Sequence, residues 1–177
     1  TANIRQDILK YKFKDDVNNL TRTKQFNVPS FRLGGTYQLS DRSALYTNIS
    51  SGFRTPTIQQ MFSGDIAVYG APTQNNPDLK PEQAYNFEVG IRGKRDWVDF
   101  DMTAFIIERK DDILSTVGQY TSRATAPVTS KYDNVGGVRN TGIELSLNTD
   151  TTKPLFFNAA YSYIRAKFTS YENYYQY

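Results

Sequence analysis

Apolar and polar residues alternate along much of this chain, and any fold it adopts must accommodate that alternation. Between Tyr85 and Arg92, aromatic and β-branched residues occupy every second position, with asparagine, glutamate, glycine and arginine between them. Side chains of a β-strand point alternately to the two faces of a sheet, so this pattern predicts a strand with one apolar and one polar face. About seven stretches of the chain follow the pattern. The sequence therefore predicts an all-β protein.

The predicted strands are long, and the segments that connect them alternate in length. Many strands reach about ten residues, enough for a tilted strand to cross a bilayer, whereas strands of soluble proteins average five or six. The short connections are 39–43, 93–96 and 148–154, and the long ones are 15–27, 52–81 and 115–131. Short turns at one membrane face and long loops at the other are typical of outer-membrane proteins. We therefore expect a transmembrane antiparallel β-barrel in which the third, fifth and seventh strands run outward.

The number of strands indicates a partial barrel. Seven strands with two free edges cannot lie in a bilayer, because every backbone donor and acceptor there must be paired. One strand with its connection averages about 25 residues, so the 22-stranded barrel of an outer-membrane transporter needs roughly 550. Residues 1–177 are therefore expected to be a fragment of one barrel domain, with the remaining strands elsewhere.

Composition excludes several other classes of protein. The chain has no Cys and no His, which removes disulfides, thiolate ligands and the commonest imidazole base and metal ligand. It has no apolar run of about 18 residues that would form a membrane-spanning helix. The formal charge of +3 is spread along the chain, so we expect no nucleic-acid partner. No paired carboxylates in a compact motif, phosphate-binding loop or nucleophile elbow is present, so we expect neither an enzyme nor a metal or cofactor site.

Three motifs interrupt the alternation. The first is Ser-Gly-Phe-Arg-Thr-Pro-Thr at 51–57, and the second is Asn-Pro-Asp-Leu-Lys-Pro-Glu at 76–82. The third is Tyr-Asp-Asn-Val-Gly at 132–136, followed by Arg-Asn-Thr-Gly-Ile-Glu at 139–144. Proline cannot donate a ladder hydrogen bond, so the prolines mark places where the chain leaves and re-enters the wall. The glycines Gly136, Gly137 and Gly142 permit a bulge or the close approach of another backbone to the inner wall.

In these residues the chain resembles the barrel of the TonB-dependent receptors. The first motif is similar to the family's Gly-Phe-Arg-Ala-Pro segment, with Thr55 in place of Ala, and the second matches the family without a change. The motifs cover residues 45 to about 164, and the first 40 residues fit in pattern only. The resemblance implies an outer-membrane receptor of a Gram-negative bacterium that imports a scarce nutrient. It also implies a plug domain and a TonB-contacting segment, both outside this chain.

The resemblance implies a ligand class as well. Haem receptors of the family carry an axial His between the first two motifs, and residues 57–75 contain none. A bare transition-metal ion also fits poorly to a surface without His or Cys, so we expect a ferric siderophore. Haem, cobalamin or another nutrient is the alternative. A general porin, with the same loop plan but no plug, and a soluble β-rich glycan-binding or hydrolytic domain are the competing classes.

Two groups of residues are candidates for contacts. Loop residues that suit an anionic chelate with flat rings are Arg54, Gln59, Gln60, Tyr69, Tyr120 and Arg123. Charges expected on the lumen side, where they would meet the plug or line a solvated wall, are Glu88, Arg92, Asp101, Arg139 and Glu144. The other expected partners are outer-membrane lipid and lipopolysaccharide, the protein's own plug domain and the TonB complex.

Overall fold

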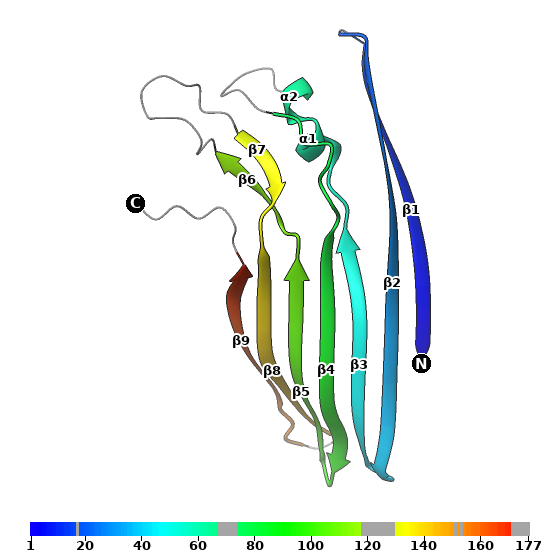
Figure 1. Cartoon of the computed structure of the whole chain (residues 1–177). Helices are drawn as coiled ribbons and strands as arrows, with labels where there is room; N and C mark the ends of the chain where they lie inside the picture. Colours follow the sequence, from blue (N-terminus) through cyan, green and yellow to red (C-terminus); the bar gives the residue numbers. More distant parts are fainter. Residues whose placement is uncertain (17, 67–73, 118–129, 151, 153, 171–177) are drawn as a thin grey trace.

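The computed structural model describes residues 1–16, 18–66, 74–117, 130–150, 152 and 154–170. Seven long strands lie side by side as an antiparallel sheet (Figure 1). In spatial order they are β1 (Ala2–Asp15), β2 (Leu20–Ser40), β3 (Ser43–Arg54), β4 (Glu82–Arg95), β5 (Val98–Lys110), β8 (Gly137–Thr149) and β9 (Asn158–Ser170). Each strand pairs with its neighbour in an antiparallel register. The expectation of an antiparallel all-β wall of seven strands is confirmed.

Shorter elements occupy the connections. Strands β6 (Ile113–Val117) and β7 (Ser130–Asn134) pair with each other beyond the ends of β5 and β8. Two short helices, α1 (Ile58–Met61) and α2 (Ser63–Ile66), lie between β3 and β4. None of the helices in the described ranges is long and apolar enough to cross a membrane. We call the end of the sheet that carries α1, α2, β6 and β7 the loop end, and the opposite end the turn end (Figure 1).

The connections follow the predicted alternation with one exception. Short turns at the turn end join β2 to β3 and β4 to β5, as expected. The long connection predicted at 15–27 is wrong, because β1 and β2 remain paired up to Asp15 and Leu20. Asn19 closes the turn with φ 51°, a left-handed conformation that asparagine tolerates. This hairpin projects beyond the other strands (Figure 1), and the first part of its second strand, Thr-Arg-Thr-Lys at 21–24, lacks the apolar alternation that identifies a membrane strand.

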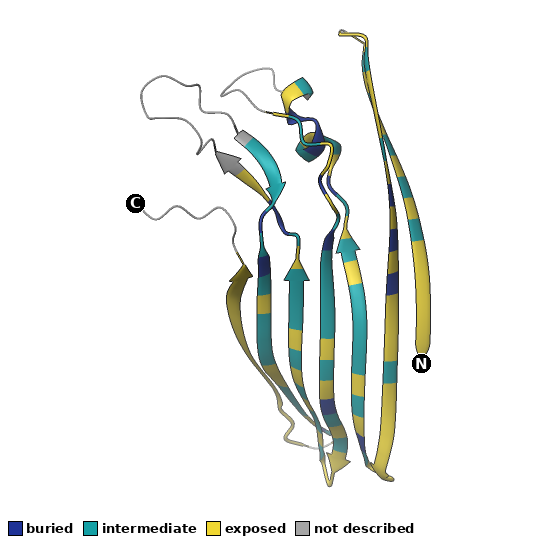
Figure 2. Ribbon diagram, in the orientation of Figure 1, coloured by how far each residue is buried: buried dark blue, intermediate teal, exposed yellow. Residues whose placement is uncertain are grey.

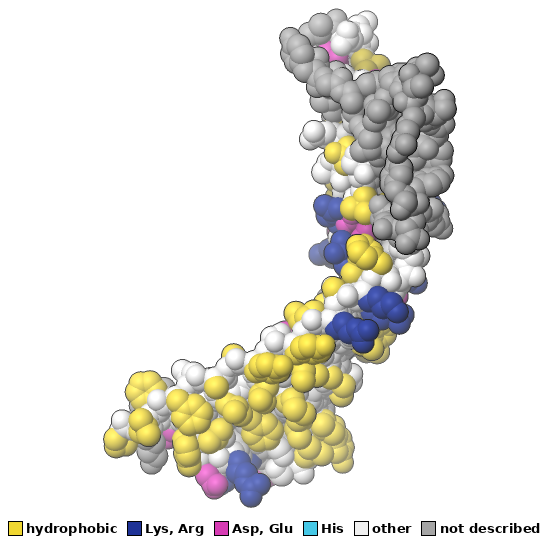
Figure 3. All heavy atoms as spheres, turned by 90° about the vertical axis from the view of Figure 1, so that its left-hand side faces the viewer, with side chains coloured by type: hydrophobic (Ala, Val, Ile, Leu, Met, Phe, Trp, Pro, Cys, Tyr) yellow, Lys and Arg dark blue, Asp and Glu magenta, His cyan; other side chains and the backbone are white. Residues whose placement is uncertain are grey.

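Pairing partners show which side chains share a face, because residues directly opposite in neighbouring strands point to the same side. One row runs Leu45, Ile91, Met102, Leu145 and Tyr161 across five strands. The side of the sheet that carries this row is called the apolar face. Met102 and Tyr161 are more than half exposed there, and the hydrophobic side chains gather into a band (Figure 3). An uncharged band of this kind is suited to lipid rather than water.

The opposite side is called the polar face. One of its rows runs Tyr46, Gly90, Thr103, Glu144 and Ser162 across the same five strands. Much of this sheet is only partly buried, and few of its residues are fully enclosed (Figure 2). A wall with one apolar and one polar face has the two-sided pattern that the sequence predicts.

Two glycines of the polar face lie beneath aromatic rings. A Cβ atom at Gly90 would lie 2.3 Å from Cζ of Tyr46, and one at Gly142 would lie 2.5 Å from Cζ of Phe105. Phe105, which interrupts the polar face in the sequence, therefore covers a glycine. This corrects the interpretation of Gly142 as a place for the close approach of another backbone. The bulge expected from the neighbouring glycines is confirmed, since the β8–β9 register shifts at Gly137.

Gly142→Ala is expected to destabilise the folded barrel by about 1–3 kcal/mol, because overpacking forces neighbouring groups apart. The added methyl group would also lie 2.5 Å from the carbonyl oxygen of Tyr163, which the β8–β9 ladder holds in place. Unfolding of the full-length protein by urea in detergent measures the effect. Gly52→Ala is the matched control, because a Cβ there meets nothing within 4 Å. Equal stability of the two variants would contradict the prediction.

A small hydrophobic core lies at the loop end. Its buried members are Phe26, Val28, Met61, Phe62, Leu79 and Ile113. Phe62 stacks on Phe13 of β1 with ring centroids 6.4 Å apart, and Arg22 of β2 pairs with Asp65 of α2 at 3.1 Å. Because Phe26 and Val28 share the polar-face side of β2, the β3–β4 connection folds over that side of the β1–β2 hairpin. The described part of this connection is therefore packed against the wall, and we call it the loop platform.

Candidate functional site

A buried carboxylate joins the first two motifs to the β5–β6 junction. Glu82 accepts hydrogen bonds from both Nε and Nη2 of Arg54, the former at 2.5 Å, and from the backbone N–H of Ile113 at 2.8 Å. Beside it, Arg109 pairs with Asp112 at 3.0 Å. Burial raises the pKa of Asp112 and the charge of Glu82 adds to that rise, against the opposing charge of Arg109. The two ion pairs and the hydrogen bond to Ile113 hold together the loop-end termini of β3, β4 and β5 and the start of β6.

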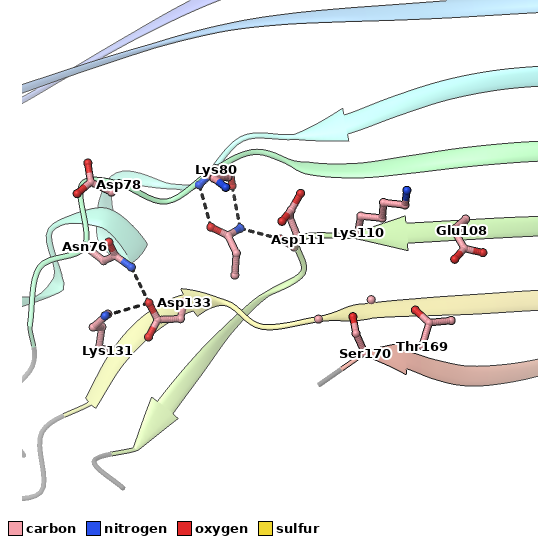
Figure 4. A pocket seen from close by; sticks show the side chains of 13 residues that line it. Asn76, Asp78, Lys80, Glu108, Lys110, Asp111, Lys131, Asp133, Thr169 and Ser170 are labelled. Carbon is pink, nitrogen blue, oxygen red and sulfur yellow. Dashed lines mark hydrogen bonds and ion pairs between the residues drawn. The ribbon is translucent and has the colours of Figure 1, made fainter. Parts of the chain in front are cut away.

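Two asparagines connect the second motif to the third (Figure 4). Asn76 donates to the carbonyl oxygen of Tyr132 and to Oδ1 of Asp133, both at 2.8 Å. Asn134 accepts from the N–H of Lys80 at 2.9 Å and donates to the carbonyl oxygens of Lys80 and Asp111 at 3.0 and 2.7 Å. The side chain of Asn134 thus acts as a clasp between two loops that are far apart in the sequence.

Asn134→Leu is expected to loosen this clasp, because the apolar side chain leaves backbone groups of Lys80 and Asp111 without their partner. The loss is about 2 kcal/mol of local stability. Hydrogen exchange of the Lys80 amide in the full-length protein reports it directly as faster exchange. Asn3→Leu, at an exposed position of β1, is the control, and equal exchange at Lys80 in the two variants would refute the role of the clasp.

A polar groove of about 720 Å³ opens beside the clasp (Figure 4). Its charged lining comprises Asp78, Lys80, Glu108, Lys110, Asp111, Lys131 and Asp133. Glu108 and Lys110 lie on the same side of β5 as the hydrophobic band, so the groove opens on that side of the wall. Within the ranges that the structure describes, no group of three or more His, Cys, Asp or Glu residues is placed to hold a metal ion.

The predicted loop contacts have different positions and partners. Arg54 forms an ion pair with Glu82, although 60% of its side chain is exposed. Gln59 is exposed on α1. Gln60 accepts from the N–H of Thr57 and its own N–H donates to the Thr57 hydroxyl, so it forms the capping box of α1. This is a structural role that the sequence interpretation missed. Tyr69, Tyr120 and Arg123 lie outside the described residues.

Four of the five predicted lumen charges share the polar face, and one does not. Glu88, Arg92, Asp101 and Glu144 lie on rows of the polar face. Arg139 is opposite Glu108 on the other side of the wall and pairs with it at 2.5 Å. The assignment of Arg139 to the lumen is therefore corrected. Above the hydrophobic band the outer side of a barrel meets headgroups and water, so a charge there does not identify the lumen.

Side chains that the sequence did not single out complete the polar face. The Tyr46 hydroxyl donates to Oδ1 of Asp101 at 2.7 Å, and the guanidinium of Arg92 lies 5.6 Å from the Tyr46 ring centroid. Asn48 accepts from Nε of Arg32 at 2.9 Å. Charges on this face thus have hydrogen-bond and cation–π partners within the wall. Tyr46 and Asn48 lie on the same rows as Gly90 and Glu88, which only the register reveals.

An antiparallel meander with an uncharged hydrophobic band on one face, a polar opposite face and long loops at one end is the wall of a transmembrane β-barrel. The chain belongs to the TonB-dependent receptors: all of residues 1–177 match the family model described as TonB dependent receptor-like, beta-barrel. That family consists of outer-membrane transport receptors. The recognition made from the three motifs is therefore confirmed.

Individual relatives agree with this family. The chain is 31% identical over 151 residues to the TonB-dependent heme receptor A of Haemophilus ducreyi, covering 76% of this chain and 20% of that protein. Among solved structures, the copper transporter OprC gives a TM-score of 0.68 at 20% identity, covering 96% of this chain and 26% of that chain. The siderophore receptor PirA from Pseudomonas aeruginosa gives 0.67 at 18% identity, covering 96% and 35%. The chain thus spans about a fifth of that curated relative, and the two structures show the fold alone.

Proposed function

We propose that the protein is a TonB-dependent importer of an iron chelate, with a ferric siderophore as its ligand, in the outer membrane of a Gram-negative bacterium. The supporting observation is that the β3–β4 connection packs over the polar-face side of the wall. In the proposed barrel this connection forms one rim of the route into the lumen. The rim presents the exposed Gln59 and the partly exposed Arg54 to a ligand arriving from outside. This chain contributes binding and passage, and no enzymatic reaction.

The ligand class follows from the side chains that the chain can offer. With no His and no Cys, it has neither of the residue types that most often bind bare transition metals or haem iron. Amide and guanidinium groups suit the oxygen atoms of an anionic chelate. Haem is the second candidate, because the relative from Haemophilus ducreyi is named a heme receptor.

The rest of the receptor completes the wall. Strands β1 and β9 are the edges of the described sheet, and unpaired edges are not stable in hydrocarbon, so further strands of the protein close the barrel. Glu88, Arg92, Asp101 and Glu144 then face a plug domain in the lumen. TonB acts through segments outside residues 1–177, and lipid surrounds the apolar face.

The test is iron-limited growth and binding by the full-length receptor with catecholate siderophore, hydroxamate siderophore, haemin and cobalamin. Gln59→Ala is expected to weaken siderophore binding about fivefold, the effect of one lost hydrogen bond. Gln38→Ala, an exposed glutamine near the turn end, is the matched control and should bind normally. Uptake of haemin alone would establish the second candidate. A receptor that takes up none of these ligands would overturn the proposal.

A further inference from the structure

Two arginines lie at the loop end of the wall, and each of them pairs with a buried carboxylate. Arg54 pairs with Glu82, and Arg109 pairs with Asp112 at 3.0 Å. The side chains of Glu82 and Asp112 are 9% and 11% exposed, whereas those of Arg54 and Arg109 are 60% and 43% exposed. The two carboxylates are thus enclosed and the two guanidiniums are accessible. We call Arg54 and Arg109 the arginine pair.

The strand register places the arginine pair on the polar face, which faces the lumen in the proposed barrel. Arg54 lies opposite Glu82 in the β3–β4 ladder. Arg109 lies opposite Ala84 in the β4–β5 ladder. Glu82 and Ala84 are separated from Gly90 by even numbers of positions on β4, so all three share the polar face. The Cα atoms of the two arginines are therefore about 10 Å apart across the sheet and about 7 Å apart along it.

Small residues form the wall between the two arginines. Gly52 lies opposite Ala84, one side-chain repeat below Arg54, and Ala84 also lies opposite Arg109. A Cβ atom at Gly52 would meet nothing within 4 Å. Gly52 and Ala84 therefore place no bulky side chain between the two guanidiniums.

The buried carboxylates hold the guanidiniums in position. Glu82 accepts from Nε and Nη2 of Arg54 and from the backbone N–H of Ile113. Among the residues that the structure describes, Nη1 of Arg54 has no hydrogen-bond partner. Asp112 pairs with Nη2 of Arg109. Because each arginine is balanced by its carboxylate, recognition here depends on directed N–H donors rather than on an excess of charge. Donors that are already held in place lose less conformational entropy when an anion binds.

We propose that the arginine pair binds free carboxylate groups of the imported ligand. A guanidinium binds a carboxylate through two parallel N–H groups, and two guanidiniums on one face suit a ligand with more than one carboxylate. The inference rests on the proposed import function and narrows its ligand. Two sources have this chemistry: an α-hydroxycarboxylate siderophore, and haem through its propionates. Arg54 and Arg109 contact the ligand, and Glu82 and Asp112 are positioning residues.

The experiment measures the binding of four ligands to the full-length receptor in detergent. Ferric citrate and haemin carry carboxylates, whereas ferrichrome and haemin dimethyl ester have no free carboxylate. R54Q/E82Q and R109Q/D112N each replace one ion pair by two amides, so the net charge is unchanged and no buried charge loses its partner. Each variant is expected to weaken the binding of the carboxylate-bearing ligand about tenfold, the effect of a lost hydrogen bond between charged groups.

E108Q/R139Q is the matched control, because it replaces an ion pair at the loop end that lies on the other side of the wall. It is expected to bind every ligand as the wild type does. The folded band in unheated gel samples shows that each variant is intact. If an amide variant does not fold, R54K/R109K replaces it, since lysine keeps the charge but loses the two-pronged geometry, and the same selective loss is expected.

The outcomes separate the two sources and the two proposals. A selective loss for ferric citrate identifies a carboxylate siderophore, and a selective loss for haemin that spares its dimethyl ester identifies haem. Equal losses for ligands with and without carboxylates, no loss at all, or the same loss in E108Q/R139Q overturn the inference. A wild-type receptor that binds only ligands without carboxylates overturns it and leaves the import proposal standing. A receptor that binds no ligand overturns both.

Discussion

Val89→Arg should destabilise the membrane-inserted barrel by about 2–4 kcal/mol, which is the cost of a cation on the lipid side of a barrel near the bilayer midplane. Val89 lies in an uncharged row of the apolar face, opposite Thr47 on one neighbour and Ala104 on the other. Its side chain is 57% exposed, so an arginine there would face hydrocarbon without a partner. Much less folded receptor should reach the outer membrane.

The measurement is the fraction of receptor that shows the folded band in unheated gel samples of outer-membrane preparations, followed by urea unfolding. Ser162→Arg is the matched control, because Ser162 is exposed on the polar face of β9. It places the same side chain in the same wall on the side that faces the lumen. A Val89→Arg protein as abundant and stable as the Ser162→Arg protein would mean that the apolar face does not contact lipid.

Leu79→Ala should remove about 2–5 kcal/mol from the packing of the loop end, the range for a leucine deleted from a core. Leu79 is only 2% exposed and packs in the small core with Met61 and Phe62. Most of the strand ladders lie outside this core, although Phe26 and Val28 of β2 belong to it, so the barrel should still insert while the β3–β4 connection opens locally. The binding of the imported ligand should fall with it.

Limited proteolysis of intact cells distinguishes this outcome from global unfolding. Cleavage should increase within the β3–β4 connection while the folded band in unheated samples is unchanged. Leu114→Ala is the control, since the side chain of Leu114 on β6 is 40% exposed and leaves no cavity. If Leu79→Ala resists protease as well as Leu114→Ala does, the loop platform is held by its hydrogen bonds and ion pairs rather than by the core.

The sequence predicts which side chains lie on each face of a strand, because the bilayer constrains one face to be apolar. Where a strand crosses hydrocarbon, one face must be apolar, so Phe87, Val89 and Ile91 identify their side without further information. The same rule does not apply where both faces meet water or headgroups. That is why the paired segment around Asp15 and Leu20 was predicted as a loop, and why Arg139 was assigned to the wrong side.

The contacts of the candidate site were less accessible to sequence reasoning. Asn134 and Lys80 are 54 positions apart, and only the folded loops bring them together. Gln60 was interpreted as a ligand contact, although Thr57 three residues before it gives the spacing of a capping box. That local signal was present in the sequence, whereas the partners of Tyr46 and Asn134 required the register and the loop conformations.

The meander has a consequence for assembly. Most strands pair with the next strand in the chain, so most of the sheet can form by the pairing of one hairpin with the next. The pairing of β5 with β8 is the exception, because β6 and β7 lie between them in the chain. The β6–β7 hairpin shortens that closure by pairing residues 113 and 134. Since the entropy lost on closing a loop grows with its length, the β6–β7 hairpin lowers the cost of pairing β5 with β8.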